Sequence, residues 1–245
     1  ILFCTNSDWF FVSHRLPIAI ETLKNDFEVH LATTVTDKYE ILRENGIIVH
    51  HLELSNSKLN PLYSLKTFIK IFKLLRYIRP NIVHAITIKP IIICGILIRF
   101  FPDISLILSF AGLGHVFSSN NLLSSFRLLI VKNIYRFCLK KKKLRVIFQN
   151  KNDLKIIRNI YRIPINKILL IHGSGINLQK YKSTKIPNGK PIILFASRLL
   201  KSKGIEYFVA ASEKVLEAKF LIAGKFDYDN PACISKKQLE NWIKL

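Results

Sequence analysis

The sequence predicts an α/β fold built on parallel strands, and two observations lead to that prediction. Short apolar segments alternate along the chain with longer segments in which apolar residues recur at helical spacing. Alternation of this kind produces βαβ units, in which successive strands run parallel. Hydrophobic residues make up 49% of the 245 residues, which is enough for a large buried core.

The alternation continues to residue 172 and predicts the elements in order. The predicted strands are residues 1–6, 27–33, 46–51, 81–85, 105–110, 144–149 and 167–172. The predicted helices between them are residues 13–24, 37–45, 65–79, 90–100, 122–140 and 152–161. Because helices cover both faces of a parallel sheet, seven such strands predict a complete, doubly wound, Rossmann-like domain over residues 1–172.

The composition changes after residue 172. Residues 173–190 are rich in Gly, Ser, Lys and Pro with little periodicity, which predicts an interdomain linker. Beyond it the pattern resumes, with expected strands at 192–196 and 218–223 and expected helices at 205–216 and 235–243. Residues 191–245 are therefore expected to begin a second Rossmann-like domain. The sequence contains no Met and opens on an apolar segment, so we expect a piece of a longer product.

Net charge narrows the classes of partner. The chain has 38 Lys and Arg against 16 Asp and Glu, a net charge of +22. This charge favours a polyanion, such as nucleic acid, an anionic membrane face or a phosphorylated substrate. An equally good explanation of the total is compositional, because Ile, Lys and Asn are all abundant and all have AT-rich codons.

Two basic segments indicate an anionic membrane face as one partner. Residues 66–79 and 127–145 combine cations with aromatic and aliphatic residues, as helices lying on such a face do. A solvated helix face is the alternative interpretation. Within the second segment, four consecutive lysines are expected to face the membrane: Lys140, Lys141, Lys142 and Lys143. No nucleic-acid module accompanies them, so nucleic acid is not an expected partner.

Cysteine usage and hydropathy predict the compartment. The four cysteines are far apart and form no CxxC pair, so neither a disulfide framework nor a zinc site is expected. The apolar segment 90–101 is shorter than the roughly 20 residues that span a bilayer, and no signal peptide is apparent. We therefore expect a cytoplasmic protein that is peripheral to the inner face of the cytoplasmic membrane.

Ligands of open parallel sheets bind beyond the carboxyl ends of strands, near a change in strand order. The loops at such ends are residues 6–15, 85–90, 110–119, 172–177 and 197–204. Arg198, Lys201 and Lys203 lie in the last of these loops, between a predicted strand and a predicted helix. Cations there, beside the free N–H groups of a helix N-terminus, can stabilise a diphosphate that gains charge as it leaves. A merely basic surface loop is the alternative.

Six segments together resemble the retaining glycosyltransferases of family 4, which have the two-domain GT-B architecture. They are residues 6–19, 82–90, 111–119, 145–154, 173–181 and 196–204. Within the family, the chain is similar to bacterial enzymes that build O-antigen, capsule or related surface polysaccharides. The resemblance implies a hexosyl- or N-acetylhexosaminyltransferase. Its donor would be a nucleotide-diphosphate sugar, with UDP the expected nucleotide, and its acceptor a lipid-diphosphate-linked glycan.

The resemblance also implies roles for individual residues. Arg198 and Lys203 match the Arg and Lys that contact the donor diphosphate, and Lys201 is expected to be a bystander. No cofactor or metal is expected, because cationic side chains take the role of Mg²⁺ in the family. The cleft loops are expected to contain Lys89, Gly112, Gly114, Gly173, Gly175 and Asn177. A plain hinge is the alternative interpretation of the Gly173–Asn177 turn.

The catalytic residue stays undecided, with His115, His14 and Asp8 as candidates. Around the last two, Trp9 or Phe10 can stack on a sugar or isoprenoid, and His14 and Arg15 can bind phosphate. Core packing explains the aromatics equally well. Three further histidines are interpreted as structural: His84 as a satisfied core residue, and His50 and His51 as surface residues without a partner.

Three alternatives to an active transferase remain open. The family's second domain supplies an acidic E-x7-E segment, and the sequence stops at Leu245 before one appears, so an inactive, C-terminally truncated remnant is the first. A non-enzymatic protein that binds polyanions or membranes is the second. The third is a GT-B-like UDP-sugar 2-epimerase, which ranks lower because such enzymes are usually less basic.

Overall fold

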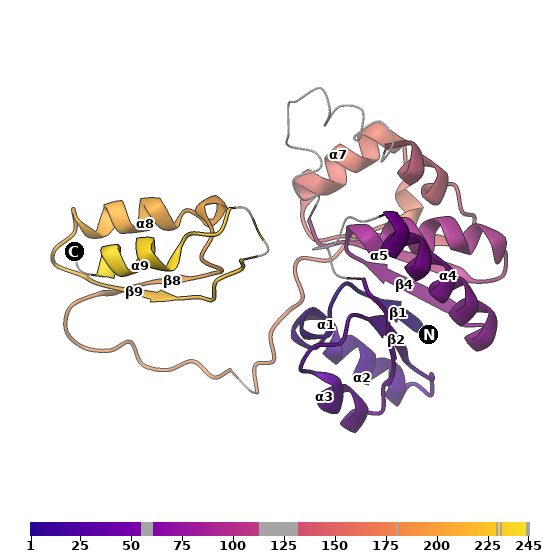
Figure 1. The fold of residues 1–245 in the computed structure, drawn as a ribbon, viewed down its shortest axis with the longest axis horizontal. Helices are drawn as coiled ribbons and strands as arrows, with labels where there is room; N and C mark the ends of the chain where they lie inside the picture. Colours follow the sequence, from indigo (N-terminus) through magenta and orange to yellow (C-terminus); the bar gives the residue numbers. More distant parts are fainter. Residues whose placement is uncertain (55–60, 113–131, 180, 229, 231, 244–245) are drawn as a thin grey trace. The chain divides into compact units, whose positions relative to one another are not determined.

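A computed structural model describes the chain except for residues 55–60, 113–131, 180, 229, 231 and 244–245, and for residues 61–64 it describes the backbone alone. The chain divides into two compact units, unit 1 at Ile1–Ile176 and unit 2 at Asn177–Leu245 (Figure 1). The predicted linker, residues 173–190, spans this boundary, and its described residues form no helix or strand.

Unit 1 is built on a seven-stranded sheet with the order β3-β2-β1-β4-β5-β6-β7. The strands are β1 (Leu2–Cys4), β2 (His30–Thr33), β3 (Ile48–His51), β4 (Ile82–Ile86), β5 (Ser105–Phe110), β6 (Leu144–Phe148) and β7 (Ile168–Leu170). Every neighbouring pair is parallel. The predicted α/β class and Rossmann-like domain are confirmed, and the strand order reverses between β1 and β4, as in doubly wound sheets.

Helices cover both faces of this sheet. The α-helices are α1 (Asp8–His14), α2 (Leu16–Lys24), α3 (Tyr39–Glu44), α4 (Pro61–Ile78), α5 (Ile88–Leu97) and α7 (Lys151–Tyr161), with 3₁₀ turns η1 (Ile98–Phe100) and η3 (Ile165–Lys167). Residues 132–139 are also helical, and the rest of the predicted helix 122–140 lies outside the described residues. Helices α1–α3 lie on one face and α4 and α5 on the other (Figure 1). Phe3 belongs to the core under α1–α3, whereas Leu2 and Cys4 belong to the core under α4 and α5. Alternate side chains of a strand point to opposite faces, so β1 belongs to two cores.

The prediction of a loop at 6–15 followed by one helix at 13–24 was wrong. Helix α1 begins at Asp8, directly after β1, and the chain breaks at Arg15 (φ −132°, ψ −13°) before α2 begins. Pro17 in the first turn of α2 explains the break, because proline has no N–H to donate to the preceding helical turn. The break places Arg15 between two helices close to the end of β1.

Helix α5 approaches the helical residues 132–139 very closely at Gly95. A Cβ atom at this position would lie 2.4 Å from the Sγ atom of Cys138. Cys138 is fully buried and lies in the last turn of that helix. The two helices can therefore pack at this distance only with glycine at position 95.

Unit 2 contains a two-stranded parallel sheet of β8 (Ile192–Ala196) and β9 (Lys219–Ala223). The 3₁₀ turn η4 (Lys201–Lys203) leads into α8 (Ile205–Ser212), and α9 (Lys236–Ile243) follows β9. A small core contains Leu199, Ile205 and Ile234, while Ile192 and Leu194 of β8 remain exposed. The predicted start of a second α/β unit is confirmed.

Gly95→Ala should lower the free energy of unfolding by about 1–3 kcal/mol, because the added methyl group overlaps the Cys138 sulfur in a packed core. Urea unfolding measures this difference. The substitution would otherwise favour a helix by about 0.5–1 kcal/mol, so the sign of the change is diagnostic.

The matched control is a double-mutant cycle with Cys138→Ala, which removes the overlapping sulfur. Gly95→Ala should cost much less in the Cys138→Ala background than in the parent chain. Equal costs in both backgrounds would contradict the proposed steric cause.

Candidate functional site

The carboxyl ends of β1 and β4 lie side by side where the strand order reverses. Cys4 of β1 is in register with Ala85 of β4, and continuing this register sets Asn6 beside Thr87. Crevices at this position bind the ligands of doubly wound sheets, because the flanking connections run in opposite directions. The residues that follow β1 and β4 therefore form the candidate site of unit 1.

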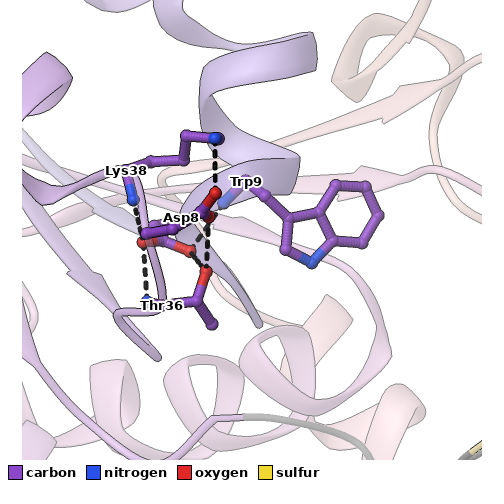
Figure 2. Close-up of polar contacts among 5 residues, drawn as sticks. Asp8, Trp9, Thr36 and Lys38 are labelled. Carbon is purple, nitrogen blue, oxygen red and sulfur yellow. Dashed lines mark hydrogen bonds and ion pairs between the residues drawn. The ribbon is translucent and has the colours of Figure 1, made fainter.

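Asp8, the first residue of α1, is fully buried, and its carboxylate accepts four hydrogen bonds (Figure 2). Oδ1 accepts from Trp9 N (2.7 Å) and Thr36 Oγ1 (2.6 Å), and Oδ2 accepts from Thr36 N (2.7 Å) and Lys38 N (3.0 Å). Burial by itself raises the pKa of this carboxyl, but the hydrogen bonds outweigh it, and the pKa lies below its ordinary value. The ionised Asp8 thus ties α1 to the loop after β2, which leaves its oxygens little capacity for catalysis.

The neighbouring aromatic residues and His14 lie along α1. The Trp9 side chain is 47% exposed, and its indole points away from the Asp8 hydrogen bonds (Figure 2). The rings of Phe10 and His14 stack with centroids 4.5 Å apart, and His14 Nδ1 lies 3.2 Å from the carbonyl oxygen of Phe10. Trp9 is therefore available to stack on a ligand, whereas one face of His14 is covered by Phe10.

Arg15 joins the end of α1 to the turn that follows β7. It is 4% exposed, and its Nη1 donates hydrogen bonds to the His14 carbonyl (3.0 Å) and to Ser174 Oγ (2.9 Å). Gly173 and Gly175 both have positive φ (69° and 71°), a conformation that glycine adopts without strain. The predicted Gly-Ser-Gly turn therefore has a structural role, because its two glycines allow the backbone conformation that brings Ser174 within hydrogen-bond distance of Arg15.

Four further residues of unit 1 were predicted to belong to the site, and the structure describes two of them, Lys89 and Gly112. Lys89 is half-buried, its Nζ donates to the Glu53 carbonyl (3.5 Å), and burial lowers its pKa. Gly112 follows β5 with a φ of 119°. Gly114 and His115 lie outside the described residues.

His84 of β4 is a satisfied core residue, which confirms that interpretation. It is buried, its Nε2 lies 2.6 Å from Ser109 Oγ, and its ring packs on Phe3 with centroids 5.3 Å apart. Burial, aided by the nearby charge of Arg15, lowers the pKa of His84 to about 3. His84 is therefore neutral at physiological pH.

The interpretation of His50 and His51 as residues without partners was wrong. His50 Nε2 lies 2.9 Å from His30 Nδ1, and His51 Nδ1 accepts from Val35 N (3.2 Å). Burial and the adjacent His30 lower the pKa of His50. Their partners come from β2 and the loop after it, which spacing along β3 alone could not reveal.

The expectation that Lys141 faces a membrane is also wrong. Lys141 is 5% exposed, and its Nζ donates to the carbonyls of Ile98 (3.4 Å), Phe101 (2.7 Å) and Pro102 (2.9 Å). These carbonyls end the helix formed by α5 and η1, where unsatisfied C=O groups favour a cation. The other three lysines, Lys140, Lys142 and Lys143, are exposed. No described helix has the length and apolar character needed to cross a bilayer.

In unit 2, the predicted diphosphate loop follows β8 and ends at α8. Arg198 Nη1 lies 2.6 Å from Asp227 Oδ2, an ion pair missed by the sequence-based interpretation, and Lys201 Nζ lies 3.2 Å from Glu206 Oε1. Asp227 lies in the loop after β9. The sequence could have indicated its contact with Arg198 only through the general rule that the ends of adjacent parallel strands meet at one edge of a sheet. Within the described residues Lys203 forms no ion pair. Asn177 Oδ1 accepts from Gln179 N (2.9 Å), within its own turn.

Backbone hydrogen bonds fix the shape of this loop. The N–H group of Ser197 donates to Ala223, the last residue of β9, that of Leu199 donates to Lys225 in the loop after β9, and that of Lys201 donates to Ala232. A Cβ atom at Gly224 would lie 2.1 Å from the carbonyl oxygen of Ser197, so only glycine lets the two strand ends approach so closely. A ligand here would therefore meet side chains and the first N–H groups of α8 rather than a loop of free N–H groups.

Residues 1–150, more than half of the chain, match the family model described as glycosyl transferase 4-like. The chain belongs to this glycosyltransferase 4-like family. The match covers β1 to β6 and so includes the whole β1/β4 edge.

Two further similarities place this glycosyltransferase 4-like chain among known proteins. It is 28% identical, over 93% of its length and 63% of the relative's, to the N,N'-diacetylbacillosaminyl-diphospho-undecaprenol alpha-1,3-N-acetylgalactosaminyltransferase of Campylobacter jejuni. Among solved structures, sucrose-phosphate synthase from Thermosynechococcus elongatus matches with a TM-score of 0.71 at 15% identity, over 99% of the chain and 66% of that structure.

An epimerase has the same fold. The UDP-GlcNAc 2-epimerase of Neisseria meningitidis bound to UDP-GlcNAc matches with a TM-score of 0.65 at 14% identity, over 99% of this chain and 69% of that one. At such identities the likeness shows the fold alone, so the GT-B architecture is confirmed while the reaction is not decided by it.

Asp8→Asn should lower the free energy of unfolding by about 1–3 kcal/mol at neutral pH, because an amide cannot accept all four hydrogen bonds. The folded pKa of Asp8 is lowered, so its contribution is present above the unfolded pKa of about 4 and is lost as the pH falls through the folded value. The stability difference between parent and variant should therefore shrink in acid. Urea unfolding at a series of pH values measures it.

Asp37→Asn is the control, because Asp37 is the exposed carboxylate beside Thr36 and Lys38. Its effect on stability should be much smaller than that of Asp8→Asn. A parent-to-variant difference for Asp8 that stays constant from neutral to acidic pH would contradict the assigned ionised state.

Proposed function

We propose that this chain serves the transfer of an N-acetylhexosamine from a UDP-sugar to a lipid-diphosphate-linked acceptor, with retention of anomeric configuration, in surface-polysaccharide synthesis. The observation that carries the proposal is the pair Arg198 and Lys203 at the carboxyl end of β8, in a chain of the glycosyltransferase 4-like family. The Campylobacter relative supports the substrate classes, since its name gives an N-acetylgalactosaminyl group and a diphospho-undecaprenol acceptor.

The chemistry of donor cleavage accounts for the two cations. When the sugar leaves, negative charge builds up on the diphosphate, and pre-positioned cations stabilise that charge without reorganisation. Arg198 can bind two phosphate oxygens through its guanidinium fork, and Lys203 acts as a point charge. With these cations at the diphosphate, the proposed reaction needs no metal ion.

Asp227 prepares Arg198 for this role. The ion pair is half-exposed on the arginine side, and exposed pairs of this kind contribute only about 0–1 kcal/mol. A diphosphate can therefore displace the Asp227 carboxylate at little cost, while before binding the pair holds the guanidinium at the strand ends. Lys201 is already paired with Glu206, which favours its assignment as a bystander.

A lipid-linked acceptor requires contact with a membrane, and one part of unit 1 has suitable chemistry. Phe137 is exposed, and the guanidinium of Arg99 lies 5.0 Å from its ring centroid. The exposed Lys140 and Lys142 lie close to Phe137 in sequence. Aromatic side chains beside cations suit the interface of an anionic bilayer.

Arg198→Ala should weaken UDP binding by roughly 10- to 100-fold, because it removes a charge-assisted contact to the diphosphate. Isothermal titration calorimetry with UDP measures the loss, and radiolabelled transfer from UDP-N-acetylhexosamine to a lipid-diphosphate glycan measures turnover. A C2-epimerised free nucleotide sugar, without transfer, would instead identify an epimerase.

Lys201→Ala is the matched control, since it removes a cation from the same loop. UDP affinity should change by less than about threefold, because the Lys201 charge is already paired. Equal losses in the two variants would indicate a general effect of positive charge, and an unchanged affinity in Arg198→Ala would refute the assignment of that residue.

Replacing Lys140, Lys142 and Lys143 together by Gln should weaken binding to vesicles of anionic lipid by roughly 100-fold, at about 1 kcal/mol for each lysine near the surface. Co-sedimentation with phosphatidylglycerol vesicles measures it. Lys141 stays unchanged because its side chain is part of the core.

The control variant carries the same loss of charge at Lys182, Lys185 and Lys190, which are also exposed. It should retain most of its vesicle binding. If both triple variants lose binding equally, net charge rather than this surface is responsible, and the proposed membrane face is incorrect.

A further inference from the structure

The β1/β4 edge contains a buried positive charge without a counter-ion. Arg15 is 4% exposed, and no carboxylate of the described chain lies within ion-pair distance of its guanidinium. Its Nε is buried and has no hydrogen-bond partner. An ionised group removed from water without a counter-ion is strongly unfavourable in a folded protein. An anionic ligand at this position would supply the missing counter-charge.

Three more polar atoms without partners lie at the same edge. Among the described residues, the buried side-chain atoms that lack a partner include Asn6 Oδ1, Ser7 Oγ and Thr87 Oγ1. Asn6 and Ser7 follow β1, and Thr87 follows β4. Buried polar groups are nearly always paired, so four unpaired ones in one place mark a site prepared for something polar.

The backbone at Thr87 is also unusual. Its φ is 73°, in a region that a β-branched residue adopts only when the surrounding structure imposes it. Its side chain makes no capping bond at the start of α5. Strained residues of this kind cluster at ligand-binding positions, which agrees with the unpaired atoms beside it.

The ionisable groups of the protein near Arg15 leave its charge uncompensated. Asp8, the acidic residue of α1, directs both carboxylate oxygens to Thr36, Lys38 and Trp9. His84, whose ring lies close enough to sense the Arg15 charge, is held neutral. The site therefore keeps one net positive charge, which selects for an anion.

Ser174 is the side chain that accepts a hydrogen bond from Arg15 Nη1. Arg15 lies at β1 and Ser174 follows β7, four strands away, so the chain after β7 returns across about 19 Å of the sheet edge. Ser174 is exposed and lies between two glycines with positive φ. The Ser174 hydroxyl is a neutral acceptor for the Arg15 guanidinium, and an anionic acceptor such as a phosphate oxygen binds an arginine more strongly.

We propose that Arg15 is the cation of a phosphate-binding site in unit 1, at the carboxyl ends of β1 and β4, with the Ser174 turn beside it. Phosphate oxygens accept from Arg15 Nε, which has no other acceptor, and either join or replace Ser174 at Nη1. This site is separate from the Arg198 loop of unit 2.

The inference rests on the proposed function for its ligand. Both substrates of that reaction carry a diphosphate, one in the nucleotide sugar and one in the lipid-linked acceptor. The shared chemistry is a phosphate group bound by an arginine fork. Which of the two supplies it is decided by competition.

The test uses the full chain with Arg198→Ala and Lys203→Ala, so that the unit 2 cations do not contribute, and inorganic pyrophosphate as the probe. Calorimetry should detect pyrophosphate binding to this chain. Adding Arg15→Gln should weaken the binding by at least about tenfold. Arg145→Gln, which removes an exposed arginine from β6 of the same sheet, should change it by less than about twofold.

Two competitors identify the source of the phosphate. Displacement of pyrophosphate by UDP assigns the site to the nucleotide sugar, and displacement by farnesyl diphosphate assigns it to the lipid-linked acceptor. Displacement by neither overturns the proposal, as do equal losses in the Arg15 and Arg145 variants.

Amide hydrogen exchange keeps the proposal testable if Arg15→Gln does not fold. In the chain that retains Arg15, pyrophosphate should slow exchange in residues 5–15 and 172–176, and unchanged exchange in both segments overturns the site. Failure here leaves the transferase proposal standing, because that proposal is tested by sugar transfer with Arg198 intact.

Discussion

The reversal of strand order between β1 and β4 is the constraint on which the rest of unit 1 depends. On the two sides of a reversal, the connections leave the sheet in opposite directions, and the carboxyl ends of the two strands stay open. The chain places a strained Thr87 and the unpaired side chains of Asn6 and Ser7 at this opening. The chain also breaks at Arg15, between α1 and α2, and the charge of Arg15 lies close enough to His84 of β4 to lower its pKa.

Two buried charges of opposite sign lie within the first 15 residues and are treated differently by the fold. The Asp8 carboxylate receives four hydrogen bonds and secures α1 to the loop after β2. Arg15 receives no comparable compensation, although it lies one helix away. A buried ion with hydrogen-bond partners stabilises the fold, whereas a buried ion without them destabilises it. Asp8 therefore has a structural role, and Arg15 is the residue proposed to bind a ligand.

Unit 2 also has an arginine proposed to bind phosphate, but this arginine is exposed and already paired. Arg198 is held by Asp227 at the ends of β8 and β9, in an exposed pair that a diphosphate can replace. Gly224 makes this geometry possible by letting the loop after β9 touch Ser197. Each unit thus has an arginine near the carboxyl ends of its strands: Arg198 is exposed and paired, whereas Arg15 is buried and has no counter-ion among the described residues.

The sequence by itself determined the α/β class, the seven strands of unit 1 and the loop that carries Arg198 and Lys203, because strand and helix periodicities are local and solvent exposure imposes them on each segment. Only the tertiary structure decided which distant residues meet. Arg15 and Ser174 are 159 residues apart, and Asp227 reaches Arg198 from a different loop. Lys141 stood in a run of exposed lysines, yet it lies in the core because the carbonyls that end α5 and η1 attract its charge. Such contacts depend on strand order and register, which the periodicity of a single segment does not encode.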